Sequence, residues 1–172
     1  MKKILPSVIA VLFFGAGLVG AFFFFRDSEE KQLRRMLDEL CEIVQKSSGE
    51  NHAVSGLKAN RADKIFAPRC EIKFGRHLFD GSYTPTELGA NIMRFKSIFK
   101  ELDITCSELT VAISDTPAGI KAAKLFFTGK CSGTLKNSPE KVNEIRDLEA
   151  IALKGEKGWR LCAVTIVKVL EK

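Results

Sequence analysis

The chain has 172 residues and a net charge of +6 at neutral pH. Without Lys2, Lys3 and Arg26, residues 27–172 carry 24 basic and 21 acidic side chains, so most of the chain is nearly neutral. A single Trp and a single Tyr offer little surface for stacking on bases, and the sequence has no basic stripe. The composition therefore argues against nucleic acid as a partner.

Residues 4–25 form an uncharged run that is apolar except for Ser7, with lysines before it and Arg26 after it. A helix of this length covers about 33 Å, and the hydrocarbon core of a bilayer is about 30 Å thick. We therefore predict a cytoplasmic tail and transmembrane anchor over 1–26 and a separate domain over 27–172. The alternative is a cleavable signal peptide, but the apolar core of such a peptide usually has only about 7 to 15 residues.

The short basic tail favours an N-terminus in the cytoplasm. We therefore expect a single-pass protein of the inner (plasma) membrane whose C-terminal domain is extracytoplasmic, in the periplasm of a bacterium. Lys31, Arg34 and Arg35 share a helical face directly after the anchor and are candidates for contact with anionic lipid head groups. An ordinary solvated helix face is the alternative interpretation.

The domain begins with helical patterns. Asp27 and Ser28 are N-cap types, and apolar residues at spacings of three and four from Leu33 to Val44 predict a helix that ends at 47–49. A shorter helix is expected over about 56–66. Alternation of apolar and polar residues predicts a strand over 70–74. A capping box that begins at Thr84 starts a third helix, whose apolar stripe continues to Leu102.

After Leu102 the apolar period changes from helical to two, which predicts a run of antiparallel strands joined by turns. The last strand is apolar on both faces, so we expect it in the centre of the sheet. The predicted strands cover residues 109–113, 120–135, 145–153 and 159–170.

The order helix, helix, strand, helix and four strands, together with a Gly turn followed by Gly158-Trp159-Arg160 in the last strand, resembles the nuclear transport factor 2-like superfamily and its SnoaL-like members. The resemblance covers about residues 30–172. It implies an α+β domain of cystatin-like cone shape, with three helices packed on a curved, mostly antiparallel sheet.

The resemblance also points to candidate catalytic residues. Superfamily enzymes similar to ketosteroid isomerase use a carboxylate base with a Tyr and a buried acid, and those similar to scytalone dehydratase use His with Asp and Tyr. His77, Asp80 and Tyr83 lie together in the loop between the first strand and the third helix. His supplies a group that titrates near neutral pH, Asp would orient it and Tyr would donate to an oxygen. The alternative is an ordinary surface turn.

Arg146 and Glu149 are charged residues within an otherwise apolar strand. With Tyr83, they are candidates for lining a pocket that binds a polar ligand. The alternative is an outer sheet face on which they form cross-strand ion pairs.

The five cysteines have no spacing typical of a metal site, so we expect no bound metal, and most of them are expected to be small buried hydrophobic residues. An exported domain would permit one or two disulfides, and the pairing stays open. Alternation places Cys106 and Cys131 on opposite faces of their strands unless a bulge intervenes. The cysteines are Cys41, Cys70, Cys106, Cys131 and Cys162.

The sequence has no phosphate-binding loop, nucleophile elbow or zinc-protease motif, and it implies no cofactor. We therefore expect a membrane-anchored, non-catalytic binding domain that presents its concave sheet to a protein partner or a small apolar ligand. One alternative is a structural subunit of a bacterial envelope complex for secretion or cell-wall synthesis. The other is a lyase or isomerase of the ketosteroid isomerase or scytalone dehydratase type.

Overall fold

The computed structural model describes residues 28–75, 80–138 and 140–169. The chain divides into two units, residues 1–32 and 33–172, and the first is described only from Ser28 onward. The predicted anchor over 4–25 lies outside the described residues, as does the predicted boundary after residue 26, and both stay predictions. Among the residues that the structure describes, none of the helices combines the length and the hydropathy needed to cross a bilayer.

The helices form where the sequence supplies an apolar face or a cap. They are α2 (Glu29–Val44), α3 (His52–Ala59), α4 (Ala62–Ile65) and α5 (Pro85–Ser97). Buried residues of α2 recur at spacings of three and four from Leu33 to Cys41, which confirms the predicted amphipathic helix. The predicted capping box is also confirmed, since Thr84 N donates to Glu87 Oε2 at 2.7 Å and Glu87 N donates to Thr84 Oγ1 at 3.3 Å.

Two predicted helix boundaries are wrong. The helix expected over 56–66 is two shorter helices, because the Asn51 side chain accepts a hydrogen bond from Val54 N at 2.9 Å and so starts α3 earlier. The third helix ends at Ser97, before the end of its apolar stripe. Phe99 and Leu102 lie in a strand instead, where Phe99 pairs with Leu135.

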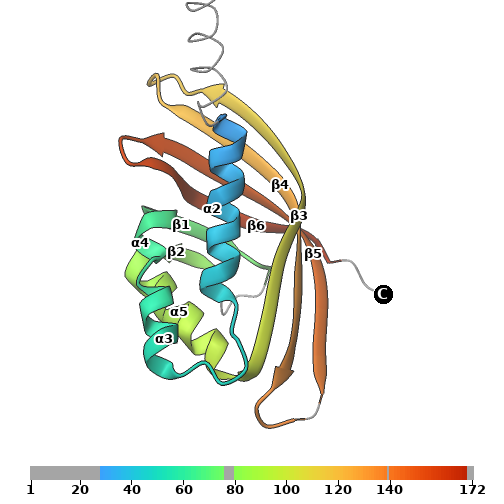
Figure 1. Cartoon of the computed structure of the whole chain (residues 1–172). Helices are drawn as coiled ribbons and strands as arrows, with labels where there is room; N and C mark the ends of the chain where they lie inside the picture. Colours follow the sequence, from blue (N-terminus) through green and yellow to red (C-terminus); the bar gives the residue numbers. More distant parts are fainter. Residues whose placement is uncertain (1–27, 76–79, 139, 170–172) are drawn as a thin grey trace, which may run out of the picture. The chain divides into compact units, whose positions relative to one another are not determined.

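The strands are β1 (Phe66–Lys73), β2 (Gly81–Tyr83), β3 (Phe99–Asp115), β4 (Lys121–Leu135), β5 (Lys141–Gly155) and β6 (Gly158–Val169). They form one curved sheet in the order β2-β1-β6-β5-β4-β3 (Figure 1). The pair β1 and β6 is parallel, and the other neighbouring strands are antiparallel. The predicted α+β class, mostly antiparallel sheet and central last strand are confirmed.

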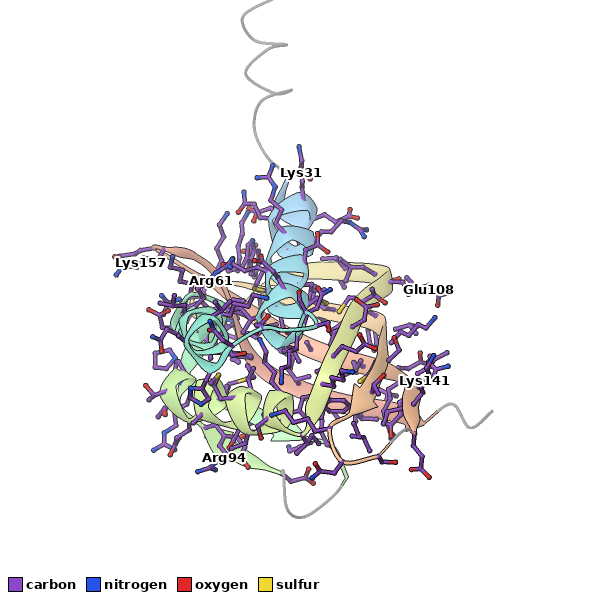
Figure 2. The ribbon with its side chains drawn as sticks, turned by 60° about the horizontal axis from the view of Figure 1, so that its bottom comes forward. Lys31, Arg61, Arg94, Glu108, Lys141 and Lys157 are labelled. Carbon is purple, nitrogen blue, oxygen red and sulfur yellow. The ribbon has the colours of Figure 1, made fainter. Side chains whose placement is uncertain are left out.

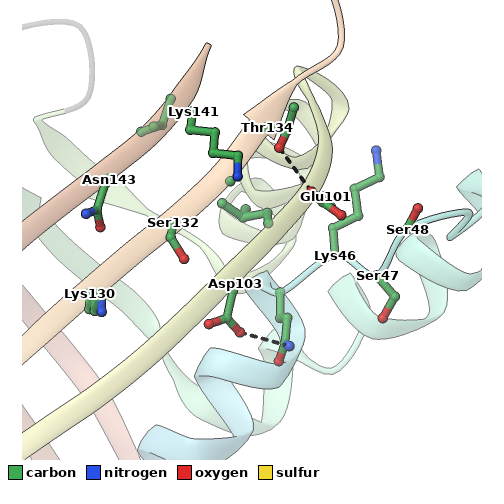
Figure 3. Close-up of a pocket in the computed structure, with 14 residues that line it drawn as sticks. Lys46, Ser47, Ser48, Glu101, Asp103, Lys130, Ser132, Thr134, Lys141 and Asn143 are labelled. Carbon is green, nitrogen blue, oxygen red and sulfur yellow. Dashed lines mark hydrogen bonds between the residues drawn. The ribbon is translucent and has the colours of Figure 1, made fainter. Parts of the chain in front are cut away.

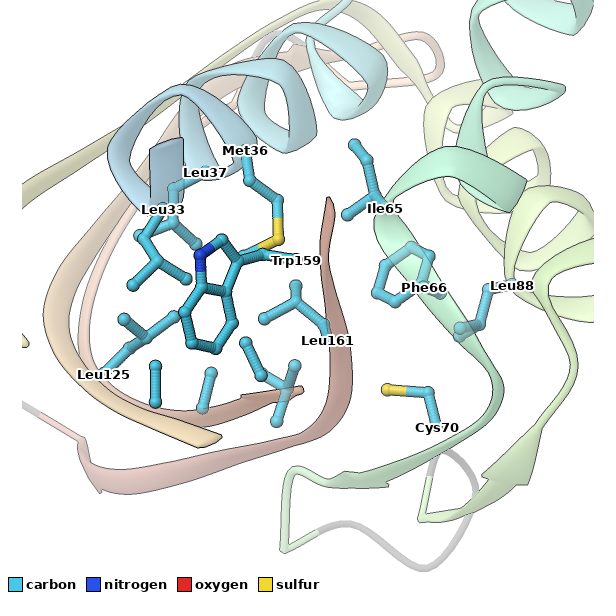
Figure 4. Packing of buried hydrophobic residues seen from close by; sticks show 14 of the residues in the cluster. Leu33, Met36, Leu37, Ile65, Phe66, Cys70, Leu88, Leu125, Trp159 and Leu161 are labelled. Atoms are coloured by element: carbon cyan, nitrogen blue, oxygen red, sulfur yellow. The ribbon is translucent and has the colours of Figure 1, made fainter. Parts of the chain in front are cut away.

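The hydrophobic core fills the side of the sheet that faces the helices. The Trp159 ring lies between residues of α2, such as Leu33 and Met36, and Leu125 of β4 (Figure 4). Phe66 of β1 and Leu88 of α5 extend the same cluster. Charged side chains such as Arg94, Glu108 and Lys157 are exposed and point outward (Figure 2).

A bulge in β3 decides which residues of that strand face the core. The register with β4 shifts between Ser107 and Thr110, and Glu108 has a positive φ of 54°. As a result, Cys106, opposite Gly129, lies on the same face as Val111, opposite Leu125. Without the bulge, Cys106 would lie on the outer face.

Candidate functional site: a polar groove beside strand β3

An open groove of about 590 Å³ lies between the segment after α2 and the paired ends of β3, β4 and β5 (Figure 3). We call it the β3 groove. Two rows of side chains cross the three strands here. The first row is Glu101, Thr134 and Lys141, and the second is Asp103, Ser132 and Asn143.

Hydrogen bonds order part of this surface. Thr134 Oγ1 donates to Glu101 Oε1 at 3.0 Å, within the first row. Gln45 Nε2, from the other wall of the groove, donates to Asp103 Oδ1 at 3.1 Å (Figure 3). The groove therefore offers hydroxyl and amide groups together with charges of both signs, since Lys130 and Lys141 also line it.

The wall formed by Gln45–Ser48 is attached to the sheet through Lys46. Its backbone pairs with Leu102 in both directions, with N to O distances of 2.8 and 2.9 Å. Its buried side chain donates from Nζ to the carbonyl oxygens of Lys96 at 3.1 Å and Phe99 at 2.7 Å. Burial lowers the pKa of Lys46, and the nearby positive charge of Lys136 lowers it further.

A buried charged cluster holds the end of the same segment. The Glu50 carboxylate contacts Lys96 Nζ at 2.8 Å and Lys58 Nζ at 2.7 Å, and Ser55 Oγ donates to it at 2.5 Å. The side chains of Glu50 and Lys96 are only 3% and 1% exposed. We call Glu50, Ser55, Lys58 and Lys96 the Glu50 cluster. Lys96 Nζ also donates to Ile43 O at 3.1 Å, so the cluster joins α2, α3 and α5.

Burial by itself would raise the pKa of Glu50. The hydrogen bonds from Lys58, Lys96 and Ser55 outweigh this effect and lower the pKa of Glu50 to about 2. The carboxylate therefore stays charged at neutral pH, and its ion pairs hold the wall of the β3 groove in place.

Comparison with known proteins identifies the fold. No protein-family model matches the sequence, and no curated protein matches it. Among solved structures, the chain is similar to a nuclear transport factor 2 (NTF2-like) superfamily protein from Salmonella enterica, with a TM-score of 0.59 and 11% identity over 84% of this chain and 93% of that chain. The chain has the nuclear transport factor 2-like fold.

Two other similar structures differ in their described roles. One is a putative scytalone dehydratase from Novosphingobium aromaticivorans, with a TM-score of 0.60 and 9% identity over 80% of this chain and 82% of that chain. The other is a putative calcium/calmodulin dependent protein kinase II association domain from Xanthomonas campestris, with a TM-score of 0.57 and 15% identity over 85% of this chain and 91% of that chain. The nuclear transport factor 2-like fold is thus shared by an enzyme-like protein and an association domain, and the fold alone does not decide between them.

The candidate catalytic residues have different surroundings in the structure. His77 lies outside the described residues. Asp80 is exposed, and its Oδ1 accepts a hydrogen bond from Phe74 N at 2.6 Å, which closes the loop between β1 and β2. Tyr83, at the end of β2, is partly buried and packs against the core.

The candidate ligand-binding residues do not form one pocket. Arg146 and Glu149 lie on opposite faces of β5, because β5 pairs with β4 in continuous register and the two residues are an odd number apart. Arg146 forms an ion pair with Glu144 at 2.8 Å, and Glu149 forms one with Lys124 at 3.0 Å. Tyr83 lies on β2, which is separated from β5 by two strands.

Lys31, Arg34 and Arg35 are exposed on α2, and their contact with lipid stays a prediction. The β3 groove and the Glu50 cluster were missed by sequence reasoning. One signal was available: Lys96 follows Leu88 and Ile92 at steps of four, which places it on the inward face of α5.

Proposed function

We propose that this chain is a non-catalytic binding domain that is tethered to the membrane through residues 4–25 and binds an extended polar segment of a partner protein in the β3 groove. The single observation that carries the proposal is the contrast between the two faces of the sheet. Apolar side chains fill the face that the helices cover, whereas the polar groove beside β3 is open.

The apolar packing on the helix-covered side of the sheet favours a non-catalytic role. Proton abstraction or dehydration needs a positioned acid and base, and these are usually held in a pocket that excludes water. Among the described residues, Lys46, Ser55 and Lys96 are buried polar residues, and the Glu50 side chain is also buried; all four support the groove wall. We therefore move the proposed binding surface from the concave face, which the sequence alone favoured, to the β3 groove.

The chemistry of the groove favours a protein segment over a small apolar ligand. A volume of about 590 Å³ is within the usual range of ligand sites, but such sites are usually enclosed, whereas this groove is open to solvent. Here the ligand would meet Glu101 and Asp103, two lysines, and hydroxyl and amide groups. An extended peptide has donors and acceptors along its whole length and can match such a surface.

Co-purification of the partner with the full-length chain from native membranes in detergent tests the proposal. Ser132→Trp fills the groove and should reduce the amount of partner at least tenfold. Ala112→Trp is the matched control, because Ala112 is exposed on the outer face of β3, nine residues and about 30 Å along the strand from Asp103, the partner of Ser132. Equal retention of the partner by both variants would argue against the groove.

The lyase or isomerase alternative is supported by the likeness to the putative scytalone dehydratase. It predicts that the purified full-length chain converts a ketone or dehydrates a hydroxy compound, and that Tyr83→Phe loses this activity while Ser132→Trp keeps it. These results would favour the lyase or isomerase alternative over the binding proposal.

A further inference from the structure

Two cysteine sulfurs meet between α2 and β3. Cys41 Sγ lies 2.8 Å from Cys106 Sγ, although 65 residues separate the two positions in the chain. Cys41 is 8% exposed, and Cys106 is half-buried. Both thiols are free in the structure.

Two features of the fold produce this contact. Cys41 follows Leu37 by four residues and is therefore on the buried face of α2. The bulge at Glu108 turns Cys106 toward the same helix. A disulfide needs a sulfur separation of about 2.05 Å, so a shift of less than about 1 Å brings the two sulfurs to bonding distance.

We propose that Cys41 and Cys106 are a site of disulfide formation by thiol–disulfide exchange with a disulfide donor of the extracytoplasmic space. One thiolate attacks a donor sulfur, which breaks the donor disulfide, forms a mixed disulfide and releases one donor thiol. The second cysteine then attacks the sulfur of the first and releases the second donor thiol. The chain loses two hydrogen atoms, and the donor is reduced to two thiols.

The surroundings of the thiols fit this exchange. The hydrogen bond between the two thiols lowers the pKa of Cys41 and raises the pKa of Cys106, so Cys41 forms the thiolate more readily. Cys70 is fully buried, and burial raises its pKa to about 12. Burial also raises the pKa of Cys131 and of Cys162, whose Sγ donates to Ile151 O at 3.3 Å.

The bond would fasten α2, which follows the predicted anchor in the chain, to β3, which carries the groove. Closing a loop of this length restricts the unfolded chain strongly and should raise the melting temperature by about 10 °C. Oxidation therefore would fix the helix against the strand that forms part of the proposed binding surface.

The full-length chain in detergent, treated with oxidised glutathione and then denatured and alkylated with iodoacetamide, tests the proposal. The number of alkylated cysteines should fall from five to three, with a loss of two hydrogens in the intact mass and a Cys41–Cys106 peptide in the digest. Cys131→Ser is the matched control and should still form the bond. Cys106→Ser should instead retain glutathione on Cys41.

Five alkylated cysteines after oxidation of the wild-type chain would overturn the proposal. So would a disulfide that joins either cysteine to Cys70, Cys131 or Cys162, or stable glutathione adducts on wild-type Cys41 or Cys106. Because these results are read on the wild-type chain, they do not depend on whether a variant folds. They also do not depend on the groove, so the two proposals can fail separately.

Discussion

Glu50 is a buried charge whose partners come from separate elements. Its removal should therefore lower the free energy of unfolding substantially. In Glu50→Gln, Lys96 keeps its charge in an almost fully buried position without its carboxylate partner. Breaking one side of a buried pair usually costs about 3–5 kcal/mol, and we expect a loss of this size in urea unfolding of the full-length chain. Glu42→Gln is the control, because Glu42 also pairs with a basic residue, Arg61, but is 56% exposed. This variant should lower the free energy of unfolding by less than about 1 kcal/mol.

The same residue predicts how stability depends on pH. The pKa of Glu50 is lowered from its usual 4.5 to about 2, so its contribution is fully present above about pH 4.5 and is lost as the pH falls toward 2. The difference in urea midpoint between the wild-type chain and Glu50→Gln should therefore be largest at pH 5–7 and should shrink steadily below pH 4.5. A difference that is the same at pH 3 and pH 7 would contradict the assigned role.

At the scale of elements, the start of α5 depends on one side chain. Thr84→Ala removes the hydroxyl that accepts from Glu87 N, and an N-cap change of this kind usually costs about 1 kcal/mol. Thr86→Ala, an exposed position within the first turn of the same helix, should be neutral or slightly stabilising because Ala has the higher helix propensity. Equal effects of the two variants in thermal unfolding would show that the cap contributes little.

Local patterns predicted the elements better than their ends and contacts. The capping box at Thr84 and the central position of β6 follow from neighbouring residues and from apolar faces, and both are confirmed. The positions of Phe99 and Leu102 fit both a helical stripe and a strand. Only the pairing of both residues with β4, and of Leu102 with Lys46, decides that they lie in a strand.

The candidate site could not be derived in the same way. The bulge requires a positive φ at Glu108, a residue type that rarely marks such a conformation. The groove, the Glu50 cluster and the Cys41–Cys106 contact all join segments far apart in the chain. Steps of four place Lys96 and Cys41 on inward helix faces, but they do not predict which distant segment each residue contacts.

For the whole molecule, the apolar run over residues 4–25 predicts a membrane protein. The full-length chain should stay in the membrane pellet after carbonate extraction and should be released by detergent, because a retained helix of this length is stable only in the bilayer core. Deleting residues 2–25 should move the chain to the aqueous fraction. Recovery of the wild-type chain from the aqueous fraction without its first residues would support a cleaved signal peptide instead.

Photocrosslinking in native membranes tests the binding role most directly. A photoreactive amino acid at Lys141, which lines the β3 groove, is compared with one at Lys157, which is also exposed but lies in the turn between β5 and β6 (Figure 2). We expect one protein adduct from position 141, absent in Ser132→Trp, and no such adduct from position 157. An adduct of equal yield from both positions, or one that persists in Ser132→Trp, would contradict binding in the groove.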